Sequence, residues 1–202
     1  MNNSLCRLMV LLLALGAQPV WAIQSPLALV QETSDRVLAK VTDKKAELNE
    51  TPSKIYALVE DIVLPHFDFV RMSRLVLGKY WRKATDTQRK AFTDQFRELL
   101  VRTYAVALLN YSGQTIKYLP MHEYEDAKAV TVNTEVREEG APPIPINYRL
   151  YLNGEHWKVF DVIIDGISLV SNYRSSFSNQ IRRKGLDSLI ARLKKKNEQG
   201  AK

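Results

Sequence analysis

Cysteine and histidine are scarce in this sequence. Among 202 residues, Cys6 is the only cysteine, and His66, His122 and His156 are the only histidines. No His-x-x-x-His or His-Glu-x-x-His pattern occurs, which argues against a zinc site. The nucleophile elbow Gly-x-Ser-x-Gly, the P-loop and the dinucleotide fingerprint are also missing. We therefore expect no metal, no cofactor and no catalytic residues, and we predict that the protein is not an enzyme.

Long apolar runs are missing after residue 22. No later segment approaches the ~20 apolar residues that are needed to span a bilayer. Before that point, Arg7 precedes a short apolar run at residues 8–16, and residues 20–22 (Val-Trp-Ala) suit signal peptidase. This pattern predicts a cleaved signal peptide, residues 1–22, rather than the alternative of a buried N-terminal helix. Since Cys6 leaves with it, the mature chain is expected to be soluble, free of disulfides and held by a packed core.

Acidic residues are outnumbered by basic ones. The 29 lysines and arginines exceed the 22 aspartates and glutamates, which gives a formal net charge of +7. The signal peptide removes only Arg7, so the mature chain carries 28 minus 22, or +6. This charge favours anionic partners such as phosphate headgroups or an anionic membrane surface. We expect no nucleic acid among the partners, because an exported protein rarely meets it. The C-terminal cations have a simpler explanation as a solvated helix face: Arg182, Arg183, Lys184, Arg192, Lys194, Lys195 and Lys196.

The first half of the mature chain has helical periodicity. Apolar residues recur every three or four positions from about Pro26 to Leu48 and again from Ile55 to Val63. Thr51 and Pro52 are predicted to start the second of these helices, which stops at Pro65. Asp68 is predicted to cap a short helix over 69–77 that ends at Gly78. The strongest signal is the capping box of residues 85–88 (Thr-Asp-Thr-Gln), which starts a helix that runs to about Asn110.

The second half changes to strand periodicity. Strands are predicted over 114–119, 130–136 and 148–152, and Asn153-Gly154 predicts a hairpin to a further strand, 157–165. That last strand is apolar on both faces, which predicts a position inside the sheet. Strict alternation puts Phe160, Val162 and Ile164 on one face and Trp157, Val159 and Ile163 on the other. Helices are expected at about 171–183 and 186–196. The order predicts one α+β domain, with a helical part at about 23–112 and a sheet-rich part at about 113–202.

Two further patterns leave alternatives open. Asp161 and Asp165 share a strand face and resemble a catalytic carboxylate pair, although a capped or solvated strand end is the simpler interpretation. The aromatic and aliphatic residues of the long helix and the strands either fill a solid core or line a pocket. Spacing alone favours the core, because periodicity cannot locate a cavity.

Two blocks of sequence carry a more specific signal. The first joins residues 67–74 (FDFVRMSR) and 77–81 (LGKYW) to 102–105 (RTYA) in the long helix. The second is the run 157–170 (WKVFDVIIDGISLV), followed by 172–174 (NYR) and Phe177. In order and spacing both blocks resemble the toluene-tolerance (MlaC) family, the periplasmic phospholipid-binding proteins of the maintenance-of-lipid-asymmetry pathway. The resemblance covers essentially the whole mature chain.

The resemblance implies a fold, a ligand and partners. It implies surrounding helices and a twisted antiparallel sheet that enclose an apolar cavity for phospholipid. It also implies a periplasmic monomer that carries phospholipid between an outer-membrane lipoprotein–porin complex and an inner-membrane ABC transporter complex. The alternatives are a periplasmic chaperone or interaction module with an apolar groove, and a small enzyme with a polar dyad in its pocket.

The predicted site combines this implication with the face assignments. We expect the strand faces to meet one side of the long helix around the acyl chains. The predicted pocket wall comprises Phe96, Leu100, Tyr104, Leu108, Tyr148, Leu150, Leu152, Phe160, Val162, Ile164, Leu169, Tyr173 and Phe177. A basic mouth near the headgroup is predicted from Arg102, Arg149 and Arg174, although each has an equally simple interpretation as a surface arginine.

Overall fold

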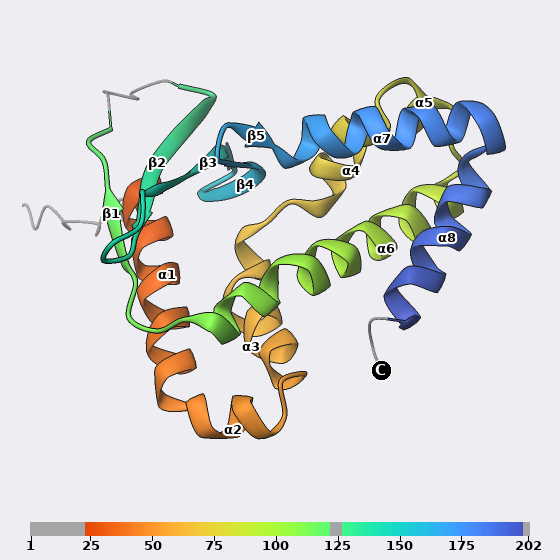
Figure 1. Cartoon of the computed structure of the whole chain (residues 1–202). Coiled ribbons are helices and arrows are strands. Elements are labelled where there is room, and N and C mark those ends of the chain that lie inside the picture. The colour runs from red at the N-terminus through yellow and green to blue at the C-terminus, as the bar shows by residue number, and fades with distance from the viewer. Residues whose placement is uncertain (1–22, 122–126, 200–202) are drawn as a thin grey trace, which may run out of the picture.

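Helices occupy the first half of the structure. The computed structural model describes residues 23–121 and 127–199 (Figure 1). The predicted signal peptide and His122 lie outside these residues. The helical elements, in chain order, are α1 (Pro26–Asp43), α2 (Lys45–Glu50), α3 (Lys54–Ile62), η1 (Leu64–His66), α4 (Phe69–Leu77), α5 (Lys79–Lys83), α6 (Asp86–Tyr104) and η2 (Ala105–Asn110).

One antiparallel sheet and two helices make up the second half. The strands pair in sequence order as a five-stranded sheet, and α7 and α8 follow it. Their bounds are β1 (Thr115–Tyr118), β2 (Ala129–Arg137), β3 (Ile144–Asn153), β4 (His156–Ile164), β5 (Ile167–Ser168), α7 (Leu169–Lys184) and α8 (Leu186–Gln199). In Figure 1, α1 stands beside the sheet, and α7 and α8 lie at the opposite end with α6 between the two ends. The predicted α+β class is confirmed.

The predicted helix caps form in the structure. The Arg71 backbone N–H donates to the Asp68 carboxylate at 2.8 Å, and α4 ends at Gly78, whose φ of 52° favours glycine. At the start of α6, the Gln88 N–H donates to the Thr85 hydroxyl at 3.2 Å, and the Thr85 N–H donates to the Gln88 amide oxygen at 3.0 Å. Both caps act within four residues, which is why the sequence predicts them correctly.

Two predicted boundaries are wrong, and a third helix changes type before its predicted end. The first helix does not run to Leu48, because it ends at Asp43 and a new helix begins after Lys44. Thr51 does not begin α3; its N–H donates to the Glu47 carbonyl and closes α2 instead. The long helix loses α geometry at Ala105 and continues as a 3-10 helix to Asn110. In each case the apolar periodicity continues through a local turn, so the pattern does not reveal the break.

A β-bulge changes the face assignment on β4. Asp161 pairs with Arg149 and Val159 pairs with Leu150, so Phe160 is an extra residue on β4. Val159 therefore shares a face with Val162 and Ile164, and the prediction that separated them is wrong. Phe160 instead joins the face of Arg149 and Tyr151: its ring centroid lies 6.0 Å from that of Tyr151. Strict alternation fails here because the bulge shifts the register by one residue.

The two faces of the sheet pack against different helices. The first face carries Val132, Tyr148, Leu150, Val162 and Ile164. We call it the α1 face because Tyr118, which shares this face, lies against Ser34 and Asp35 of α1. The opposite face, which we call the α4 face, carries Arg149, Tyr151 and Phe160. The guanidinium of Arg71 on α4 lies 3.8 Å from the Tyr151 ring centroid and 4.9 Å from that of Phe160. β4 is thus covered on both faces, as its apolar sequence predicts.

Buried apolar side chains form two separate clusters. The first joins the sheet to α4, α7, α8, the N-terminal part of α1 and α6 as far as Leu100. The second joins α2 and α3 to the C-terminal part of α1 and to Val101 and Ala105. Two separate clusters differ from the usual arrangement, in which a domain has one contiguous core.

Throughout the described ranges, no helix is long and apolar enough to cross a bilayer.

Candidate functional site

The boundary between the two clusters is the candidate site. It crosses α6 between Leu100 and Val101 and crosses α1 between Val30 and Val37. Three half-buried tyrosines lie along it: Tyr104 near the boundary on α6, and Tyr118 and Tyr148 on the α1 face. We call these three tyrosines and the apolar side chains around them the apolar seam. All three tyrosines pack against the first cluster, and neighbouring atoms do not fully cover them.

The electrostatics of the seam are those of a poorly solvated interior. Burial raises the pKa of Tyr148 to about 12, and the nearby Tyr118 adds to this effect. Burial likewise raises the pKa of Tyr104 to about 12, with Tyr173 as a second cause. Tyr148 is half-buried, so neighbouring side chains leave part of its surface uncovered. Such an environment favours apolar ligand groups and disfavours charged ones.

Tyr118 is a seam residue that the sequence prediction missed. Burial raises its pKa, the Ser34 hydroxyl opposes the rise, and Asp35 adds to it. These neighbours place Tyr118 against the middle of α1, between the two clusters. The alternating pattern of the strand predicted at 114–119 puts Tyr118 on one face, but so short a strand does not indicate which face is buried.

Part of the predicted pocket wall lies in closely packed interior. Phe96 stacks edge-to-face on Tyr173, with ring centroids 5.3 Å apart, and Phe177 lies 5.3 Å from the Tyr173 ring. Phe96 is fully buried and Phe177 is 3% exposed, so neighbouring side chains leave them little surface for a ligand. Five other predicted wall residues are also buried: Leu100, Leu150, Val162 and Leu169, and Phe160 on the α4 face.

The remaining predicted wall residues keep accessible surface. Tyr104, Tyr148, Ile164 and Tyr173 are half-buried and pack against the first cluster. Leu108 is half-buried and packs against the second cluster. Leu152 is exposed near the β3–β4 turn, opposite Trp157. The structure therefore brings Tyr104 and Tyr148 to the seam and places Leu152 at the end of a hairpin.

The three candidate headgroup arginines have separate surroundings. Arg102 on α6 lies 2.6 Å from Glu98 and faces the Tyr56 ring of α3. Arg149 lies on the α4 face of the sheet, 3.7 Å from Asp161. Arg174 on α7 lies against Gly78, where an added Cβ would stand 3.2 Å from its guanidinium. The three side chains have different neighbours, and a shared basic mouth stays a prediction.

Asp161 has a structural environment. It is 1% exposed, and its carboxylate accepts hydrogen bonds from the Ser168 hydroxyl at 2.7 Å and the Val170 N–H at 3.1 Å. It therefore helps to cap α7, which agrees with the interpretation as a capped strand end. Asp165 is exposed in the following turn, with a φ of 49°. In the part of the chain that the structure describes, no three metal-binding side chains come together.

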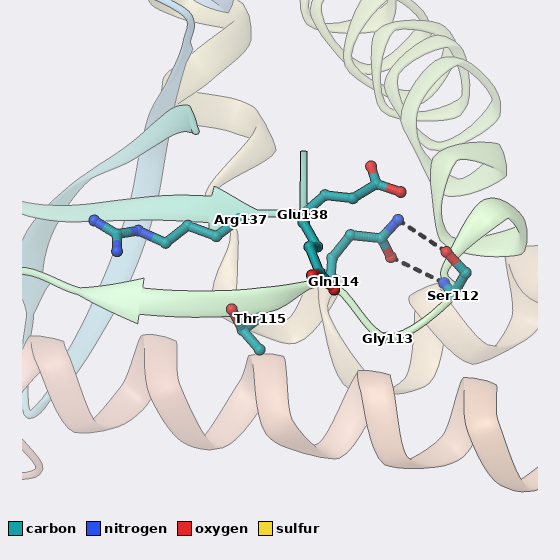
Figure 2. A pocket seen from close by; sticks show the side chains of 7 residues that line it. Ser112, Gly113, Gln114, Thr115, Arg137 and Glu138 are labelled. Carbon is teal, nitrogen blue, oxygen red and sulfur yellow. Dashed lines mark hydrogen bonds between the residues drawn. The ribbon is translucent and has the colours of Figure 1, made fainter. Parts of the chain in front are cut away.

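One hollow of the surface is polar. It has a volume of about 560 Å³ and lies between the turn before β1 and the end of β2 (Figure 2). Its lining includes Arg137, Glu138 and Glu139, and the Gln114 amide bonds back to Ser112. Charged and amide groups would leave acyl chains without apolar contacts here. This hollow is therefore less suited to a lipid tail than the seam.

Known proteins resemble this chain over nearly its whole length. The model of the family described as MlaC protein matches residues 31–195. The toluene tolerance protein ttg2D of Pseudomonas putida is 32% identical over 88% of this chain and 83% of its own length. The MlaC binding protein of the intermembrane phospholipid transport system of Haemophilus influenzae is 25% identical over 87% of this chain and 83% of its own.

A solved structure agrees with the fold. The phospholipid-binding protein from Ralstonia solanacearum, solved in complex with a phospholipid, matches with a TM-score of 0.82 and 33% identity. The match covers 89% of this chain and all of that structure. The family resemblance predicted from the two sequence blocks is confirmed, and this chain belongs to the MlaC family.

Proposed function

We propose that this protein is a periplasmic carrier that shuttles glycerophospholipids between the outer membrane and the inner membrane. The observation that carries the proposal is the seam: two hydrophobic clusters meet at half-buried aromatic side chains instead of merging into one core. The phospholipid complex of the Ralstonia relative supports the same ligand class. In this proposal the acyl chains lie in the seam, between the α1 face of the sheet, α1 and the boundary on α6.

The energetics require release at a partner. Burial of acyl chain stabilises by about 0.8 kcal/mol per CH2 group, so two chains of roughly 16 carbons approach ~25 kcal/mol against water. That figure exceeds the practical ceiling of non-covalent affinity, and spontaneous loss into water would be very slow. A bilayer offers nearly the same environment, so exchange between membrane and seam is close to balanced. The carrier therefore unloads where a docked complex opens the seam.

The proposed partners are those that the family resemblance implies. An outer-membrane lipoprotein–porin complex would exchange lipid with the carrier at one end, and an inner-membrane ABC transporter complex at the other. The energy for net transport comes from the transporter, so the carrier itself needs neither a nucleotide nor a cofactor. The headgroup stays near the surface, because burying a phosphate without partners is costly. This transport maintains the lipid asymmetry of the outer membrane.

The test is direct extraction of the bound ligand. The protein is purified without detergent from the periplasm, extracted with chloroform and methanol, and the extract is quantified by mass spectrometry. A stoichiometric amount of phospholipid, together with transfer of labelled phospholipid between two vesicle populations, is expected. Protein that holds no phospholipid and transfers none would refute the proposal. Stoichiometric bound peptide in its place would favour the alternative of a chaperone or interaction module.

A further inference from the structure

Aliphatic side chains cross one end of the α1 face. Ile146 of β3 lies opposite Ile164 of β4, and Ile164 lies opposite Ile167 of β5. Ile144 comes two residues before Ile146 and therefore points to the same face, where it lies opposite Val136 of β2. We call Ile144, Ile146, Ile164 and Ile167 the isoleucine rows. They form a continuous aliphatic surface across three strands.

The accessible surface of this face increases toward the isoleucine rows. Along β3, Leu150 is fully buried, and Tyr148 and Ile146 are half-buried. Ile144, at the start of the strand, is 50% exposed, and Ile167 on the edge strand is 59% exposed. Because Tyr148 belongs to the apolar seam, the isoleucine rows continue the seam to the surface of the protein.

Other directions out of the seam along the sheet are closed by packed side chains. Toward the opposite end of the α1 face, Val130, Leu150 and Val159 lie side by side and are 8%, 0% and 3% exposed. Leu152 is exposed beyond this row, but the buried row separates it from the seam. On the α4 face, Arg71 of α4 packs over the aromatic rings of the sheet. An acyl chain therefore reaches the surface most directly over the isoleucine rows.

The backbone under the isoleucine rows is fixed by hydrogen bonds. The Asp165 N–H donates to the Pro145 carbonyl at 2.9 Å and ties the β4–β5 turn to β3. The Thr134 hydroxyl donates to the Ile146 carbonyl at 2.6 Å. Thr134 also stands between Ile146 and the seam residue Tyr118 in one row across the sheet. A surface that is fixed in this way lowers the entropic cost of holding a ligand.

We propose that the isoleucine rows are the mouth of the seam and hold the glycerol ends of the acyl chains of a bound phospholipid. This proposal rests on the carrier function proposed above. The methyl ends then lie deeper, beyond Tyr148, and the headgroup extends into water, because burying a phosphate without partners is costly. Glu138, Glu139 and Asp165 flank the rows in the chain, so a zwitterionic headgroup is favoured at this mouth over an anionic one.

The experiment locates the acyl chains with a fluorophore on single cysteines of the mature protein. Because Cys6 lies in the predicted signal peptide, the mature chain has no competing thiol. Bimane is attached to Ile144→Cys and, separately, to Ile167→Cys. Val70→Cys on α4 is the matched control, since Val70 is 58% exposed, and Leu152→Cys reports on the opposite end of the α1 face. Each protein is loaded from phosphatidylcholine vesicles whose acyl chains carry a nitroxide near the carboxyl end or near the methyl end, and is separated from the vesicles before the fluorescence is read.

The carboxyl-end nitroxide is expected to quench bimane at both positions of the mouth. Ile144 lies four residues, or about 13 Å, from Tyr148 along β3, so this nitroxide should quench there at least about threefold more than the methyl-end nitroxide. Bimane at Val70 and at Leu152 should keep the fluorescence of protein that is loaded with unlabelled phospholipid.

Extraction of the same samples separates failure of the mouth from failure of the carrier function. Bound phospholipid without quenching at Ile144 and Ile167, stronger quenching by the methyl-end nitroxide, or quenching at Leu152 instead would overturn the proposed mouth and leave the carrier function intact. Absence of bound phospholipid would overturn both.

Discussion

The position of the lipid tails is tested by two neighbouring isoleucines on β4. Ile163 and Ile164 are consecutive and both half-buried, but they lie on opposite faces of the sheet. Ile164 shares the α1 face with the seam residue Tyr148, and Ile163 lies on the α4 face with Arg149. Substituting each by glutamate introduces the same charge at a half-buried position. We expect Ile164→Glu to lose bound phospholipid and Ile163→Glu to keep it.

The magnitude follows from the burial of Ile164. Full burial of an isoleucine side chain is worth about 1.5–3 kcal/mol, so the half-buried side chain contributes about 1–2 kcal/mol that the substitution removes. In a solid core, the unpaired carboxylate would cost several kcal/mol more and use up much of a total stability of about 5–15 kcal/mol. At a seam that lipid can vacate, water enters with the charge and this second cost is relieved. Ile164→Glu should therefore lower Tm by only about 2–8 °C.

The assay measures stability and lipid content on one sample. Circular dichroism gives Tm, and extraction with mass spectrometry gives the phospholipid per protein. A carboxylate against acyl chains costs enough to lower the phospholipid content of Ile164→Glu by more than about tenfold. A folded Ile164→Glu protein with wild-type phospholipid content would refute the assignment of the tails to the α1 face. Equal loss from Ile163→Glu would refute the choice of face.

Three further predictions concern stability, titration and processing. Asp161→Ala should destabilise the fold by about 2–4 kcal/mol in urea unfolding, because it removes a helix cap and leaves the buried Val170 N–H without an acceptor. The control Asp94→Ala, at an exposed position, should cost less than about 0.5 kcal/mol. The phenols of Tyr104 and Tyr148 should ionise near pH 12 in absorbance titration. Because their folded pKa lies above the unfolded value of about 10, stability should be intact below pH 10 and fall from pH 10 to 12; unfolding midpoints that stay constant over this range would contradict it. Intact mass of the periplasmic protein should correspond to a chain that starts at Ile23, and retention of residues 1–22 would contradict the predicted signal peptide.

Local signals in the sequence determined much of the fold. The capping box of residues 85–88 and the Asp68 cap act through hydrogen bonds within one helical turn, so they are legible without any tertiary information. The order of helical and strand periodicity likewise determined the α+β class, and the two sequence blocks identified the family. The breaks after Asp43 and at Ala105 were not predictable, because apolar spacing continues across them.

Only the tertiary structure decided which residues meet at the seam. Alternation along 157–165 placed Phe160 beside Val162, but the bulge opposite Arg149 and Leu150 turned it to the α4 face. A single extra residue in a strand reverses which face each later side chain points to, and the sequence pattern does not show where the extra residue lies. The same holds for Tyr118, whose place between Ser34 and Tyr148 depends on how α1 packs on the sheet. The boundary between two hydrophobic clusters depends on how distant segments of the chain pack together, so no single segment of the sequence specifies it.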